Sequence, residues 1–157
     1  MANVSPGYTF TSSSDPITYT KLNLLAQPTV TLGAAEVTNS NLDASGGIGY
    51  LTGNGGTVTQ STSKSTAVTL NKPSGQITLN NAALASDTTV SFTLNNVCCQ
   101  IGDVLILNHV SGGTAGSYLL NAQTTTGSAS INVRNITGGS LSEAIVIGFA
   151  VIKGATS

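Results

Sequence analysis

The sequence contains few charged residues. Only 7% of its 157 residues are Asp, Glu, Lys or Arg, compared with about 25% in an ordinary soluble protein. The formal net charge of −1 provides no field that would attract nucleic acid or an anionic membrane. Disorder usually accompanies high charge and low hydrophobicity, whereas 39% of this chain is hydrophobic. We therefore expect a folded protein that binds neither nucleic acid nor a membrane.

Long apolar runs and a secretory signal are also missing. The longest apolar run, residues 144–152, is interrupted by Gly148 and is far shorter than the ~20 residues of a membrane helix. The first ten residues lack a basic segment followed by an apolar one. We expect synthesis in a cytoplasm, so the glycosylation patterns at Asn3 and Asn135 are expected to be accidental.

Side chains that bind metals or act as nucleophiles are scarce. The chain has one histidine, His109, and two adjacent cysteines, Cys98 and Cys99. Neighbouring cysteines rarely bridge each other, so we expect free thiols, one facing the core and one facing outward. A His109–cysteine pair would be a nucleophilic site. We favour instead a strand-end histidine that is hydrogen-bonded to a neighbouring strand or subunit.

The six acidic residues are scattered singly along the chain: Asp15, Glu36, Asp43, Asp87, Asp103 and Glu143. Asp87 and Asp103 stand where aspartate commonly caps a turn. The glycine-rich segments at 53–57 and 111–117 lack the Gly-Lys-Ser/Thr of a phosphate-binding loop. We expect no catalytic site, no metal and no cofactor.

Serine and threonine are abundant, and threonine favours strands because its branched Cβ packs well on a pleated surface. Eight segments separated by turn residues read as strands: 57–61, 66–71, 75–80, 88–94, 103–110, 117–123, 130–136 and 143–152. Several alternate apolar and polar residues, as in a sheet with one buried face. We predict an all-β fold, an antiparallel two-sheet sandwich of jelly-roll type. An immunoglobulin-like arrangement is the alternative, but its Cys–Trp–Cys signature is absent.

Two of these segments, 103–110 and 143–152, are apolar on both faces. Such strands either lie centrally or present one face to another subunit. A second or third copy of the chain would cover such a face, so we expect an oligomer. The residues predicted at this interface between subunits are Val104, Ile106, Ile145, Ile147, Phe149 and Val151.

Residues 1–45 differ from the remainder, 46–157. A helix is predicted from Pro16 to Ala26, capped by Ser14 or Asp15, and residues 29–37 read as a possible strand. A helix of about three turns is not stable alone in water, so it must dock on something. We expect residues 1–45 to form an extended attachment arm, whose contacts come from Ile17, Leu22, Leu24 and Leu25.

Residues 49–154 contain a series of segments that resembles, in order, the C-terminal module of head-decoration, head-fibre and tail-fibre-like proteins of tailed bacteriophages. The series is "GY.TG.GGTVTQ", "TSKST.VTLNK", "G.IT.N.AALA", "VSFTL.N", "NH.SGGTAG.Y", "N.T.GSLSEA" and "FAVIKG". Near the N-terminus, "GYTF" and "DPIT..KLN.L" are similar to the leader of short phage structural proteins.

This resemblance implies a trimeric virion protein. A capsid decoration protein (cement or head fibre), located on the capsid surface and bound to the major capsid protein of the shell, fits the short chain best. The alternative is a tail-fibre, tail-spike or collar component, which would be present in far fewer copies per particle. A bacterial adhesin or carbohydrate-binding module is disfavoured by the absence of tryptophan and of a secretory signal, and an enzyme by the absence of a recognisable site.

Overall fold

The structure is a computed structural model that describes residues 3–5, 29–31, 49–50 and 53–154. The chain divides into two compact units, residues 1–48 and 49–157, close to the predicted boundary after residue 45. Each unit is described by itself below. No helix in the described part of the chain has the length and apolar character that a membrane crossing requires.

In the first unit, β1 (Asn3–Ser5) pairs antiparallel with β2 (Thr29–Thr31). The second strand begins the segment that the sequence predicts as a strand. The predicted helix at 16–26 lies outside the described residues, and so do all four predicted attachment residues, Ile17, Leu22, Leu24 and Leu25.

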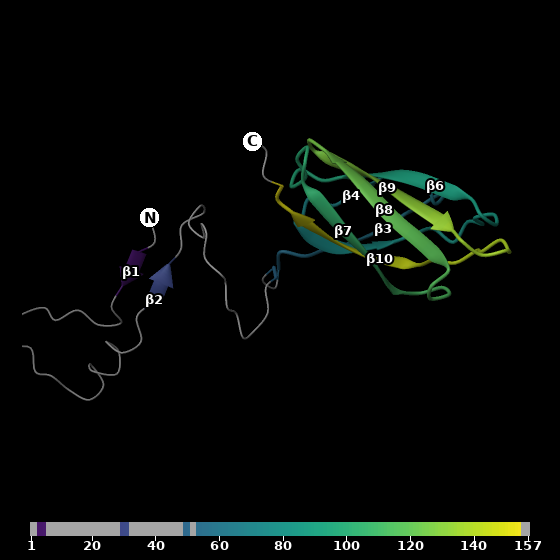
Figure 1. The fold of residues 1–157 in the computed structure, drawn as a ribbon, viewed down its shortest axis with the longest axis horizontal. Helices are drawn as coiled ribbons and strands as arrows, with labels where there is room; N and C mark the ends of the chain where they lie inside the picture. The colour runs from purple at the N-terminus through teal and green to yellow at the C-terminus, as the bar shows by residue number, and fades with distance from the viewer. Residues whose placement is uncertain (1–2, 6–28, 32–48, 51–52, 155–157) are drawn as a thin grey trace, which may run out of the picture. The chain divides into compact units, whose positions relative to one another are not determined.

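The second unit is all-β, as predicted (Figure 1). Each of the eight predicted segments overlaps one strand. They are β3 (Thr57–Thr59), β4 (Val68–Thr69), β5 (Ser74–Thr78), β6 (Thr89–Asn95), β7 (Val104–Ser111), β8 (Tyr118–Thr125), β9 (Ser128–Asn135) and β10 (Val146–Ile152).

These strands form two four-stranded sheets, in the orders β3-β5-β10-β7 and β4-β6-β9-β8. From β3 to β10 the chain changes sheet at every connection except the β8–β9 hairpin, whose turn places Gly127 at a positive φ of 81°. The result is the predicted sandwich, with one refinement. The β3–β5 and β4–β6 pairs are parallel, because each pair is joined by a crossing through the other sheet rather than by a hairpin.

The core lies between the two sheets and is mostly aliphatic. Buried side chains recur at every second position along β6, β9 and β10, which confirms the alternation seen in the sequence. The fully buried side chains include Ile77, Leu79, Leu94, Ile131, Val133, Ile145, Ile147 and Val151. Strand β10 is central, whereas β7 lies at a sheet edge.

Candidate interaction surface and polar clusters

The six residues predicted at the trimer interface separate into two groups. Ile145, Ile147, Phe149 and Val151 are buried in the core of their own chain, because the facing sheet of the same sandwich covers the inner side of β10. Val104 and Ile106 lie on the outer side of β7, with exposed fractions of 55% and 49%. Of the predicted set, therefore, only these two are on the surface of the described unit.

Val104 and Ile106 belong to a larger apolar surface on the outside of the β3-β5-β10-β7 sheet. The register places Ile106 opposite Ala150 and Val104 opposite Ile152. We call this surface the apolar face; its residues are Val104, Ile106 and Val110 of β7 and Val146, Ala150 and Ile152 of β10. None of the four strands of this sheet contains an Asp, Glu, Lys or Arg.

A hollow of about 540 Å³ lies beside the β7 residues of this face. Its floor runs along β10, at Gly148 and Ala150, and its wall on one side includes Ile106. Gly148 matters to this shape, because a Cβ placed there would lie 2.8 Å from the Cγ2 of Val110. The remaining lining residues are Gly55, Gly56, Thr57, Ser74, Gly75, Gln76, Asn108 and Phe149.

The outer face of the other sheet is polar. On adjacent strands β6, β9 and β8, Ser91, Asn132 and Asn121 lie in register. The Ser91 hydroxyl donates to Asn132 Oδ1 at 2.5 Å, and Asn132 Nδ2 donates to Asn121 Oδ1 at 2.6 Å. Next to this row, Arg134 pairs with Asp87 at 2.6 Å. These side chains therefore hydrogen-bond to one another across the outside of the sheet.

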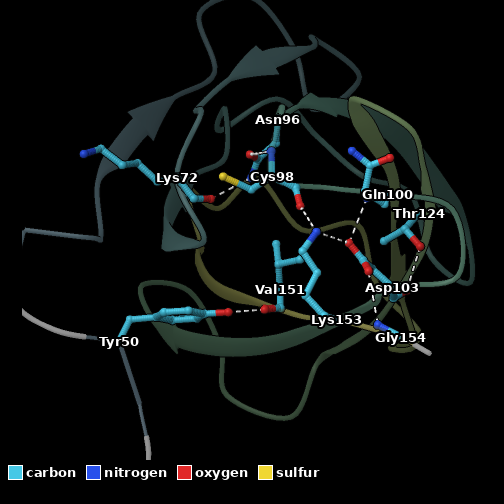
Figure 2. Close-up of polar contacts among 10 residues, drawn as sticks. All are labelled: Tyr50, Lys72, Asn96, Cys98, Gln100, Asp103, Thr124, Val151, Lys153 and Gly154. Atoms are coloured by element: carbon cyan, nitrogen blue, oxygen red, sulfur yellow. Dashed lines mark hydrogen bonds and ion pairs between the residues drawn. The ribbon is translucent and has the colours of Figure 1, made fainter. Parts of the chain in front are cut away.

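A buried carboxylate joins the start of β7 to the end of β10 (Figure 2). Asp103 Oδ2 accepts from the Gln100 N–H at 2.8 Å and from Lys153 Nζ at 2.7 Å. Its Oδ1 accepts from the Gly154 N–H at 3.1 Å. The hydrogen bond from Lys153, aided by the two backbone N–H groups, holds the pKa of Asp103 below its usual value. The turn-capping role predicted for Asp103 is confirmed.

The loop before β7 holds both cysteines. Both are free; Cys99 is fully buried and Cys98 partly so, as predicted. Burial raises the pKa of the Cys99 thiol, which keeps it protonated and unreactive. The loop is fastened by Asn96, whose Oδ1 accepts from the Cys98 N–H at 3.0 Å and whose Nδ2 donates to the Lys72 carbonyl at 2.8 Å (Figure 2).

His109 lies near the opposite end of β7 from the cysteines. Five residues of extended strand, about 17 Å, separate it from Val104, so no His109–cysteine pair is formed. Its Nε2 lies 2.6 Å from the Gly112 carbonyl, and its ring meets that of Tyr118 edge-on at 6.0 Å. The strand-end position predicted for His109 is confirmed, but its hydrogen bond is to its own turn rather than to a neighbouring strand or subunit; β8 is contacted through the Tyr118 ring.

Glu143 fastens the β7–β8 loop. Its carboxylate accepts from the Thr114 hydroxyl at 2.7 Å, the Thr114 N–H at 3.0 Å and the Tyr118 hydroxyl at 2.7 Å. These donors, led by the Thr114 hydroxyl, lower the pKa of Glu143. Burial, followed by the hydrogen bond to Glu143, raises the pKa of the Tyr118 hydroxyl. All of these groups are used in holding the loop.

Two buried polar side chains were not identified from the sequence as structural anchors. Lys64 is buried, and its ammonium donates to the carbonyls of Asn80 and Glu143; burial lowers its pKa. Asn135 is fully buried and donates to the carbonyls of Leu84, Ala85 and Gly139. A glycan therefore cannot be attached to Asn135 in the folded protein. No local signal marks Lys64, because its Ser- and Thr-rich surroundings are typical of an exposed loop.

Within residues 49–50 and 53–154, no three His, Cys, Asp or Glu side chains come together as a metal site would require. The ionisable side chains described above instead hold turns and strand ends in place. No protein-family model, curated protein or solved structure matches this chain.

Proposed function

We propose that this protein is a structural component of a tailed-bacteriophage virion that decorates and stabilises the capsid exterior. In this proposal the sandwich forms a homotrimer, and residues 1–45 bind the major capsid protein of the shell. The observation that supports it best is the uncharged apolar face of the β3-β5-β10-β7 sheet. Such a surface suits a protein whose role is permanent association.

The resemblance of residues 49–154 to the phage decoration and fibre module supports the same proposal. So does the use of the described ionisable groups, since Asp103, Glu143 and Lys64 each fasten backbone segments of the sandwich. In such a domain these polar groups hold strand ends and loops in fixed positions. Rigidity and self-association are the properties that a decoration protein needs.

Attachment through the arm should resist salt. Residues 1–45 contain only Lys21, Asp15, Glu36 and Asp43 as charged side chains. Burial of apolar groups and backbone hydrogen bonds must therefore dominate the binding, and ionic strength screens neither of them.

The test uses particles that lack the protein. Full-length protein and a version comprising residues 46–157 are added at low salt and at ~1 M salt, where screening is nearly complete. We expect the full chain to decorate the particles under both conditions and the shortened chain to fail. Equal decoration by the shortened chain would show that the arm is not the anchor. On native particles, on the order of hundreds of copies indicates the head, and about a dozen or fewer indicates the tail alternative.

A further inference from the structure

The outward-facing side chains of β7 form a ridge on the apolar face. Val104, Ile106 and Val110 are exposed to 55%, 49% and 45%, and they follow one another along one side of an eight-residue edge strand. Across the sheet, Ile152 of β10 extends the ridge next to Val104. An edge strand of this length usually carries a charge or a proline that discourages pairing with another chain, and β7 carries neither.

A groove runs beside this ridge. Along β10, Gly148 and Ala150 provide almost no side-chain bulk, which leaves the hollow of about 540 Å³ between Ile106 and the strands β5 and β3. The register places Asn108 and Gln76 on either side of Gly148. Within the described residues, neither of these exposed amides makes a side-chain hydrogen bond, in contrast to the Asn121–Asn132 pair on the opposite sheet. Both are free to hydrogen-bond to whatever enters the groove.

We infer that the occupant of the apolar face is a second copy of this chain, with the β7 ridge of one copy seated in the β10 groove of the next. The face has no charge with which to select an acidic or basic partner. An uncharged partner surface with a matching ridge is required, and this chain itself provides one. The inference deepens the proposed function by naming the surface of self-association, and it depends on that function only for the number of copies.

The size of the face bears on the strength of this association. The strands β3, β5, β7 and β10 contain three, five, eight and seven residues. At ~3.3 Å per residue and ~4.8 Å between strands they cover about 360 Å² on each copy, or about 700 Å² for a pair. The strands alone fall short of the ~1,000 Å² of a specific interface, so we expect association that depends on protein concentration. Ile106 lies midway along the β7 ridge and opposite Ala150, so a charge introduced there would be desolvated on association.

The experiment measures the mass of the full-length protein in the absence of particles, by light scattering over a range of concentrations. The variant is Ile106→Lys, and the matched control is Leu119→Lys. Leu119 is 53% exposed on β8, the eight-residue edge strand of the other sheet. We expect an oligomer for the wild type and the control, and at least about 30-fold weaker association for Ile106→Lys, with an unchanged circular dichroism spectrum.

Two results would overturn the inference: a monomeric wild type at ~100 µM, or an Ile106→Lys variant that is folded and associates as the wild type does. If Ile106→Lys does not fold, the pair Val104→Thr and Ile106→Thr retains β-branched side chains and provides the same readout. Unchanged association of that variant would also overturn it. The particle test of the arm is scored separately, so failure of this interface and failure of the proposed capsid role are distinguishable.

Discussion

The two outer faces of the sandwich differ, although the two sheets are built alike. Each sheet has four strands and an eight-residue edge strand, β7 or β8. On β7 the outward side chains are mostly aliphatic, whereas on β8 only Leu119 is aliphatic among Asn121, Gln123 and Thr125. The inward side chains must be apolar for the domain to fold, but the outward ones are under no such demand. The difference between the outer faces is therefore the one that the proposed self-association predicts.

The two outer faces also differ in how much free energy further contacts could add. The Ser91–Asn132–Asn121 row satisfies its own hydrogen bonds. The exposed side chains of the apolar face leave burial free energy unused, since fully burying one such side chain is worth about 1.5–3 kcal/mol. Association through the apolar face would recover part of this free energy, whereas the same contact through the polar face would cost desolvation.

The largest effect on stability is expected from a substitution on the inner side of β10, compared with one on its outer side. Ile147→Ala should lower the free energy of unfolding by about 2–5 kcal/mol, because it leaves a cavity in the core. Val146→Ala, one residue away on the outer side, should change it by no more than about 0.5 kcal/mol in dilute solution. Urea denaturation at low protein concentration measures both, and equal costs would contradict the assignment of inner and outer sides.

The second prediction concerns the carboxylate that ties β7 to β10 at the edge of the apolar face. Because the pKa of Asp103 is lowered in the folded state, its contribution to stability is complete above the unfolded pKa of about 3.9 and is lost as the pH falls through the folded value. Asp103→Asn should therefore reduce the melting temperature at pH 7 and flatten its dependence on pH below about 4.

The matched control for this prediction is Asp87→Asn, which removes the carboxylate from the exposed pair with Arg134 on the polar side. Exposed pairs contribute little to stability, so this variant should follow the wild-type melting profile. Identical pH profiles for Asp103→Asn and the wild type would rule out Asp103 as the clamp between these strands.

The third prediction concerns Cys98 and Cys99 in the loop before β7. Replacing both by alanine should lower the free energy of unfolding by about 1–3 kcal/mol and leave assembly intact. Cys99→Ala should account for most of the loss, since Cys99 is fully buried and Cys98 is not. Denaturation of the single variants measures the division, and elemental analysis measures zinc. Stoichiometric zinc, or a loss that arises mainly at Cys98, would contradict the packing role.

The smallest effect is expected on the polar face. Asn132→Ala removes the central member of the hydrogen-bonded row and should cost about 0.5–1 kcal/mol, because its partners regain water. Gln123→Ala, an exposed residue of the neighbouring strand, is the control and should cost less. Neither change should alter the oligomeric mass. A change in oligomeric mass for Asn132→Ala would indicate that the interface lies on the β4-β6-β9-β8 sheet, contrary to the inference.

Much of the fold was predictable because β-strand periodicity is a local property. The apolar residues of the alternating segments, such as Ile77, Phe92 and Ile131, are buried in the core. The sequence also predicted the turn role of Asp103, the strand-end position of His109 and the split between Cys98 and Cys99, but not that His109 hydrogen-bonds to its own turn. It failed to separate the core residues Ile145, Ile147, Phe149 and Val151 from a trimer interface, because an apolar run does not reveal which of its faces is covered by the same chain.

By itself, then, the sequence determined the all-β class, the eight strands, the alternation of inner and outer residues and the scarcity of reactive groups. These features follow from local steric preference and from composition. Only the tertiary structure decided that β3 pairs in parallel with β5 and β4 with β6, that Lys64 is buried, that Asp103 meets Lys153, and that the outer sides of β7 and β10 combine into one face. Those contacts join residues distant in the chain, and their positions depend on strand order and register, which no local pattern encodes.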